Sequence, residues 1–337
     1  MLSSILFILH RFKGLFLTST FLVILISCNS EEEPEIVIDN TPSDVLLFSK
    51  NPNGHNELYK LENAIESVIL SDSNFDYWWP KVSPDKKSLL VYRSAVNSSK
   101  NHDDYANAEL ILANIDGSNP EVIIEKNKHG WLSQGVCRWN KDGTKILMGA
   151  EIETNGSVQW RLVTTDVNGD NPKVLSNHWG IDCNFSIDNA HIYFIGFTKN
   201  ELTTDLTKFE LQRGEFDSVN DTLTNITSLT VNNTRDHDPD LSPDNTKVIF
   251  SAGNAEYSDV DLVLFDTATQ KEMVLLDDQK ANGGSMCWSP DGQSIYFHSL
   301  DLFKSPFEIK KIDVASGTIR TVLKSDGSFG YFHPEVY

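Results

Sequence analysis

Short apolar runs separated by polar turns recur along most of the chain. Runs of β-branched and aromatic residues such as 248–250 and 295–297 each follow a polar turn, a pattern typical of buried strands. After each such run the chain reads strand, Gly/Asn/Asp turn, strand, which predicts a hairpin. The clearest hairpins are expected at residues 110–124, 161–175, 262–276 and 309–323. One strand before the polar turn, one after it and the hairpin together predict a repeating unit of four antiparallel strands.

The polar turn occurs five times in the sequence. Its shared aspartate falls at Asp85, Asp142, Asp188, Asp244 and Asp291. Successive copies are therefore about 50 residues apart, and a period of that size with strand-like content is typical of a radial β array.

The turn has a physical reading. Ser-Pro-Asp-Gly suits a type I turn, with Pro fixing φ at the second position. The fourth position needs a positive φ, which Gly143 and Gly292 adopt freely and which Asn189 and Asn245 tolerate. Lys86 stands there in the first copy, so we expect either mild strain or a different turn.

The two ends of the repeat region complement each other. Residues 44–70 match the last three strands of a unit, and residues 332–337 match the first strand. Joined, they make one unit, which would hide the edges that an open β array exposes. The sequence therefore predicts an all-β, six-bladed β-propeller of four-stranded antiparallel blades over residues 44–337, with one blade shared by the two ends.

The fullest copy of the turn carries a family resemblance. Residues 288–292 read Trp-Ser-Pro-Asp-Gly, and the segment resembles the TolB-like, or WD40-like, propeller repeat of bacterial envelope proteins. Residues 82–85 and 241–244 match without the Trp or the Gly, and 139–143 and 185–189 keep only parts. The resemblance implies hosts that range from protein-docking modules to peptidase and glycan-lyase domains, so the fold alone does not choose a function.

The N-terminal segment predicts export. Residues 1–27 have a basic start and an apolar run, as a signal peptide does, and the Leu-Ile-Ser-Cys end resembles a bacterial lipobox. In that family the cysteine, here Cys28, becomes the lipid-modified first residue of the mature chain. The alternative is an uncleaved anchor helix with an incidental cysteine, but the apolar run is short for a membrane span.

Residues 28–43 are acidic and are expected to form a disordered tether. An acidic run just after the lipid cysteine resembles the surface-export signal of Bacteroidetes-type lipoproteins. We therefore expect an outer-membrane lipoprotein that is surface-exposed, with a periplasm-facing position as the alternative.

Charge narrows the class of partner. The chain has 48 acidic and 28 basic residues, and its net charge of −20 excludes an electrostatic footprint for nucleic acid or anionic lipid. Neutral, cationic or calcium-bridged partners are favoured, with the membrane reached through the lipid anchor only, and we expect a monomer. Cys137, Cys183 and Cys287 are interpreted as small buried residues on inner strands, with a Cys137–Cys183 bridge as the alternative.

No local catalytic motif is present. A Gly-x-Ser-x-Gly elbow, a zinc helix, a phosphate-binding glycine loop and a dinucleotide fingerprint are all missing. Residues 236–240 begin like a calcium loop, but Leu241 and Lys247 stand where its turn glycine and closing glutamate belong. We expect no cofactor and no tightly bound metal.

One group of residues stands where the chain is expected to enter the central channel. The candidate ligand-binding residues are Trp79, Asp182, His237, Asp238 and His333. The alternative is that these groups cap strand ends or line a solvated pore.

Two further expectations concern the same region. Strand alternation predicts that Asp236, Asp238 and Asp240 face one way and His237 the other. Aromatic side chains near the strand ends can stack on sugars or anchor a protein, or they can pack between blades. These aromatic residues are Tyr77, Trp78, Trp79, Trp131, Trp160 and Trp179.

The leading hypothesis is a lipid-anchored, non-catalytic binding module for an envelope protein or a glycan. Its rival is a glycan-degrading enzyme of the oligosaccharide-lyase kind with a site at the central channel. The missing catalytic motifs favour the first, and the His and Asp residues at the channel motivate the second.

Overall fold

The computed structural model describes residues 44–98, 104–197, 209–232, 234–253, 260–277, 282–300 and 307–337. The predicted signal peptide, Cys28 and the predicted tether lie outside these residues. The chain divides into the units Met1–Glu35 and Ile36–Tyr337, and the second unit contains every described element. No helix among the described residues is long and apolar enough to cross a membrane.

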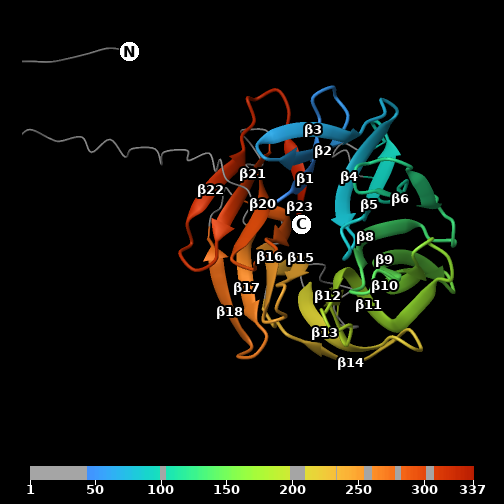
Figure 1. Ribbon diagram of the computed structural model, residues 1–337. Coiled ribbons are helices and arrows are strands. Elements are labelled where there is room, and N and C mark those ends of the chain that lie inside the picture. Colours follow the sequence, from blue (N-terminus) through green and yellow to red (C-terminus); the bar gives the residue numbers. More distant parts are fainter. Residues whose placement is uncertain are drawn as a thin grey trace, which may run out of the picture. The chain divides into compact units, whose positions relative to one another are not determined.

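The described elements are 23 strands in five antiparallel sheets, which confirms an all-β propeller fold. The sheets stand around a common centre, with β4, β8, β15 and β23 innermost and β3, β14, β18 and β22 outermost (Figure 1).

Four of the sheets have four strands each. The first contains β23 (Tyr331–Val336), β1 (Leu46–Lys50), β2 (Glu57–Glu62) and β3 (Ile65–Leu70). The second contains β4 (Phe75–Val82), β5 (Ser88–Ala95), β6 (Glu109–Asn114) and β7 (Glu121–Ile124). The third contains β15 (Arg235–Leu241), β16 (Lys247–Gly253), β17 (Val260–Asp266) and β18 (Lys271–Leu276). The fourth contains β19 (Asn282–Trp288), β20 (Ser294–Leu300), β21 (Glu308–Asp313) and β22 (Ile319–Leu323).

The fifth sheet has seven strands, so the predicted count of six separate four-stranded blades is not confirmed. Its strands are β8 (Ser133–Trp139), β9 (Lys145–Thr154), β10 (Ser157–Asp166), β11 (Lys173–Phe185), β12 (His191–Phe197), β13 (Glu210–Asp217) and β14 (Thr222–Ser228). The reason is β11, which runs unbroken for 13 residues. Its first half pairs with β10 and its second half, from Trp179 onward, pairs with β12.

The two ends of the repeat region meet as expected. C-terminal β23 pairs antiparallel with β1, with Leu46 opposite Val336 and Lys50 opposite Tyr331. The sheet order β23-β1-β2-β3 therefore joins the last strand of the chain to the first three, and β23 covers the inner edge of β1.

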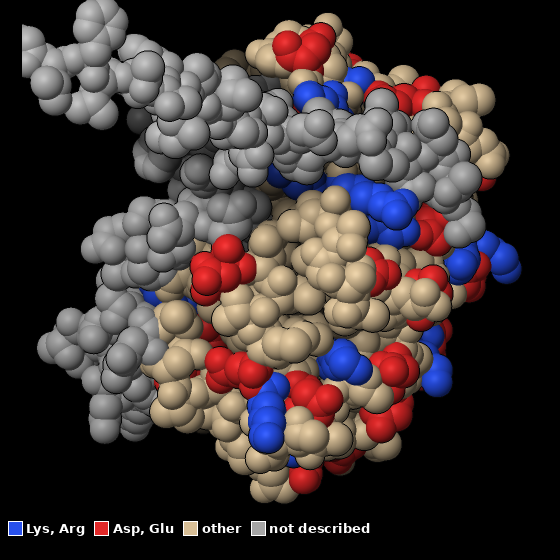
Figure 2. Space-filling view, turned by 90° about the vertical axis from the view of Figure 1, so that its left-hand side faces the viewer, with Lys and Arg blue, Asp and Glu red and all other residues tan. Residues whose placement is uncertain are grey.

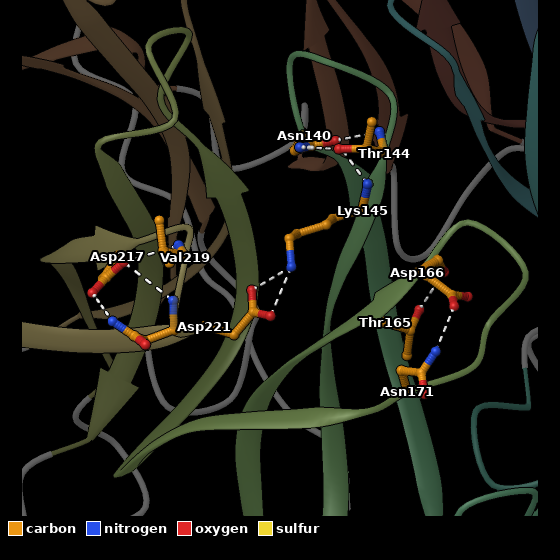
Figure 3. Close-up of polar contacts among 10 residues, drawn as sticks. Asn140, Thr144, Lys145, Thr165, Asp166, Asn171, Asp217, Val219 and Asp221 are labelled. Carbon is orange, nitrogen blue, oxygen red and sulfur yellow. Dashed lines mark hydrogen bonds and ion pairs between the residues drawn. The ribbon is translucent and has the colours of Figure 1, made fainter.

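The repeated turn adopts the predicted backbone in all five copies. Its fourth residue has a positive φ everywhere, including 60° at Lys86, where strain was expected. In the Ser copies the hydroxyl donates to the turn aspartate, as from Ser242 Oγ to Asp244 Oδ1 at 2.7 Å, and accepts from a backbone N–H, as from Lys247 N at 2.9 Å. In the second copy Asn140 replaces the serine, and its Oδ1 accepts from Thr144 N and Lys145 N (Figure 3). The turn therefore keeps its shape although its first residue changes.

Burial falls from the centre of the unit to its outside. Apolar side chains among the described residues gather in six clusters, and each cluster draws on two successive repeats. Outer strands such as β3 and β18 are mostly exposed. On the face drawn in Figure 2, acidic and basic side chains are interspersed with uncharged ones. The polar groups that are buried deeply enough to form a site therefore lie toward the centre.

Candidate functional site

The inner strands carry a repeated irregularity. Each of β4, β8, β11, β15, β19 and β23 breaks its register with its neighbour, as a β-bulge does. In five of them a residue other than glycine takes a positive φ. These residues are Trp79 (52°), Asp182 (39°), Asp238 (51°), Ser285 (65°) and His333 (51°). Such a conformation costs on the order of 1 kcal/mol each and recurs at functional sites.

Four of the five bulge residues were predicted as site residues, and the structure brings all the predicted residues together. Trp79, Asp182, His237, Asp238 and His333 line one cavity of about 570 Å³. The other lining residues are Tyr105, Gly135, Trp160, Trp179, Ile181, Phe197, Phe209 and His298. We call this the start cavity, because it lies where the inner strands begin. Whether these residues bind a ligand stays a prediction.

The predicted alternation of side chains along β15 is wrong. His237 and Asp238 both line the start cavity, whereas strict alternation would send them to opposite faces. The bulge is the reason, because the register breaks between His237 and Asp240 and the left-handed turn at Asp238 redirects its side chain. Asp236 is instead buried against Thr230 and Leu211, and Asp240 lines a different cavity.

Two carboxylates and an imidazole form the polar wall of the start cavity. His237 Nδ1 lies 3.1 Å from Asp182 Oδ2, and the Asp238 backbone N–H donates to the same oxygen at 3.4 Å. Burial and the nearby Asp182 charge raise the pKa of Asp238 to about 7, although His237 acts in the opposite direction.

Two further imidazoles are neutral. Burial lowers the pKa of His298 to about 3 and lowers the pKa of His333 well below its usual range. The backbone N–H of His333 donates to Nδ1 of His298 at 3.3 Å, which leaves the His298 proton on Nε2.

Two polar atoms beside these imidazoles have no partner. The His333 ring lies 4.8 Å from the Trp79 ring, and both side chains are more than nine-tenths buried. Trp79 Nε1 and His333 Nδ1 make no hydrogen bond with any of the residues that the structure describes. Buried polar atoms without partners are rare in folded proteins and need an explanation, such as a missing ligand.

The rest of the start cavity is aromatic. Trp160 belongs to β10, the third strand from the centre, and reaches the cavity because two glycines lie beneath its ring. A Cβ built on Gly135 or on Gly149 would lie 3.4 Å from the indole. Trp160 and Trp179 are partly exposed in the cavity, whereas Trp78 and Trp131 pack in the core. Packing between blades therefore holds for Trp78 and Trp131, and stacking on a ligand stays a prediction for Trp160 and Trp179.

Sequence reasoning missed several lining residues, including His298, Phe197 and Phe209. It searched only the beginnings of the inner strands. Because neighbouring strands are antiparallel, the second strand of each unit ends at the same place, and the third strand begins there. His298 near the end of β20 and Phe197 at the end of β12 follow from that rule.

The described residues contain no group of three or more His, Cys, Asp or Glu side chains that could hold a metal ion. The expectation of no bound metal stays a prediction. Cys137, Cys183 and Cys287 are all buried and free, as interpreted.

Comparison with known proteins identifies the fold. The chain matches no protein-family model and no protein of curated function. It is similar to the solved structure of TolB from Acinetobacter baumannii, with a TM-score of 0.67 and 17% identity, over 87% of this chain and 66% of that one. A putative TolB from Agrobacterium tumefaciens gives 0.60 and 15%, over 88% and 99%. An oligogalacturonate lyase from Vibrio parahaemolyticus gives 0.53 and 12%, over 83% and 74%. At these identities the likeness shows a TolB-like propeller fold and does not separate a binding module from an enzyme.

Proposed function

We propose that this protein is a non-catalytic binding module of the cell envelope, and that the start cavity holds part of an envelope protein or a glycan. The observation that carries this proposal is the pair of buried, unpartnered atoms, Trp79 Nε1 and His333 Nδ1, beside an aromatic wall. A ligand with hydroxyl or amide groups would satisfy both atoms and stack its apolar faces on Trp160 and Trp179.

Crosslinking in cells tests the site. A photoreactive phenylalanine analogue at Trp179, partly exposed in the start cavity, should capture the partner, and mass spectrometry of the product distinguishes protein from glycan. The matched control is the same analogue at Met273, which is 51% exposed on outer strand β18. Equal capture of the partner at both positions would contradict the proposal.

The proposed address is the outer membrane, through lipid chains on Cys28 and a tether over residues 28–43, facing the cell surface. The acidic run in the tether supports the surface position. Stable anchoring requires more than one hydrocarbon chain. Cys28→Ser should therefore move the protein from the membrane to the soluble fraction, measured by fractionation and immunoblot. A variant that stays in the membrane with unaltered gel mobility would contradict lipidation.

We also propose that the propeller has six blades and acts as a monomer. The seven-stranded sheet then counts as two blades that share β11. Six apolar clusters, each between successive repeats, support this count, because six blades in a closed ring have six interfaces.

The second candidate is a glycan-degrading enzyme of the lyase kind. It is favoured by Asp238, whose pKa of about 7 suits a general acid or base. Release of unsaturated ends from oligogalacturonides, abolished by Asp238→Asn and by His237→Ala, would support it. Metal analysis adds a second readout, because one equivalent of manganese, zinc or calcium that survives dialysis and is lost in His237→Ala would favour the enzyme.

A further inference from the structure

A second cavity lies at the other ends of the inner strands. It encloses about 540 Å³ and shares no lining residue with the start cavity. The repeated turns form part of its wall, for example at Ser186 and at Pro243. We call it the end cavity.

The end cavity contains one side chain from an equivalent position of each inner strand. In five strands this residue stands two places after the positive-φ bulge residue, and in β8 it follows the register break. The six residues, which we call the axial ring, are Lys81, Arg138, Asn184, Asp240, Cys287 and Glu335. Equivalent positions around a closed array face one axis, so these side chains surround the same space.

Both carboxylates of the axial ring already have partners. Lys81 Nζ lies 2.6 Å from Glu335 Oε2, and the Val82 N–H donates to the other oxygen at 3.2 Å. Asp240 accepts from Asn184 Nδ2 at 2.7 Å and from the Trp288 N–H at 3.1 Å. None of these four contacts involves Arg138.

Arg138 has no counter-ion within ion-pair distance among the described residues. Its side chain is 7% exposed, its Nη1 donates to the carbonyl of Cys137 at 3.1 Å, and its Nε has no acceptor. Burial acts to lower the pKa of Arg138, but the charges of Asp240 and Glu335 raise it overall, so the guanidinium stays charged. A buried charge without a counter-ion in direct contact is costly.

We propose that the end cavity binds a carboxylate group through Arg138. The planar fork of a guanidinium matches the two oxygens of a carboxylate. The charges of Lys81, Arg138, Asp240 and Glu335 sum to zero, so Asp240 and Glu335 would repel a doubly charged phosphate more strongly than a singly charged carboxylate. Lys141 and Asn140 at the cavity wall add donors for the same anion. This site is separate from the start cavity and does not depend on the function proposed for it.

The carboxylate can come from an acidic side chain, from a chain terminus or from a free small acid. Three probes separate these sources, namely N-acetylglutamic acid α-amide, N-acetylalanine and acetate. Binding of each to the full chain in detergent is followed by ligand-observed NMR at constant ionic strength, with N-acetylalanine amide as the uncharged control. The tightest probe identifies the source.

Arg138→Gln should weaken the tightest probe at least about thirtyfold, the smallest loss expected when one partner of a buried charge pair is removed. Arg138→Lys keeps the charge but loses the fork, so it should bind at an intermediate level. Lys271→Gln, which removes an exposed positive charge on outer strand β18, should bind like the parent. The proposal is overturned if no carboxylate probe binds the parent more tightly than the amide control, or if a folded Arg138→Gln protein binds as the parent does.

Discussion

The two ends of the inner strands solve the same geometric problem in different ways. At the start cavity the backbone is irregular, with left-handed residues such as Asp182 and His333, and the walls are aromatic with imidazoles held neutral. At the end cavity the left-handed residues are confined to the repeated turns, which have one shape, and the walls carry a ring of charged groups. The same inner strands line both cavities, so the difference in lining residues arises within a few residues of each bulge.

The comparison teaches where variation is tolerated in a closed repeat. The turns at the end cavity have the same shape, so successive sheets start at equivalent positions. Their Ser and Asp side chains make local hydrogen bonds, including one with a backbone N–H. The bulges at the start cavity have no such common chemistry, since Trp79, Asp238 and Ser285 occupy equivalent positions. Among the described residues, buried polar atoms without hydrogen-bond partners occur at both ends, and we propose that ligands satisfy them.

The largest expected effect comes from removing a strand that serves both cavities. Deletion of residues 332–337 takes away His333 from the start cavity and Glu335 from the end cavity, and it exposes the inner edge of β1. We expect a loss of about 4 kcal/mol in the free energy of unfolding, similar to that of a large buried side chain. Chemical denaturation measures it, with Tyr337→Ala as the control. An unchanged midpoint would contradict closure by β23.

The next effect separates paired from unpaired charges in the end cavity. Lys81→Met leaves Glu335 buried with one remaining donor, and should cost about 3 kcal/mol. Lys81→Met combined with Glu335→Gln should recover most of that loss, because no charge is then left unpaired. Arg138→Met should cost less than Lys81→Met, because it leaves no carboxylate without an ion-pair partner, although the charges of Asp240 and Glu335 favour the guanidinium.

Thermal unfolding of the four proteins, the parent included, measures this contrast. If Arg138→Met lost as much stability as Lys81→Met, Arg138 would have a structural partner and the comparison between the two charges would fail.

Much of the fold follows from the sequence because its determinants are local. The positive φ at Lys86 and Asn245 follows from the turn chemistry, and the pairing of β23 with β1 follows from the two incomplete ends. The unbroken β11 was not predicted, because nothing in residues 173–185 forbids one long strand and only the neighbouring sheets decide it.

The candidate site was predicted in part for a similar reason. Trp79 and His333 follow from their place at the beginning of inner strands. The orientation of His237 does not, because a bulge is set by pairing with β16 and not by the residues alone. Arg138 was missed as a candidate because its isolation depends on which ring members pair, and that depends on three-dimensional register.

The smallest expected effect is on the pH dependence of stability, and it is tested with two aspartates that lie near each other in the sequence. Burial and Asp182 raise the pKa of Asp238 to about 7, above the value of the unfolded chain, so the parent loses stability as pH rises from about 4 through 7. Asp238→Asn removes this loss, so its stability relative to the parent should rise over that range. The low pKa values of His298 and His333 act on both proteins alike, so their contributions cancel.

Asp244 in the repeated turn gives the opposite sign and serves as the matched control. Hydrogen bonds from Thr246 and Ser242 lower the pKa of Asp244 to about 2, so its contribution to stability is present above the unfolded pKa and is lost as pH falls. The stability of Asp244→Asn relative to the parent should therefore decrease as pH rises from about 2 to 5. Melting temperatures of both variants across pH 3–8 measure the two slopes. The prediction would be wrong if the melting temperatures of the two variants, relative to the parent, changed with pH in the same direction. It would also be wrong if the difference between Asp238→Asn and the parent did not change with pH.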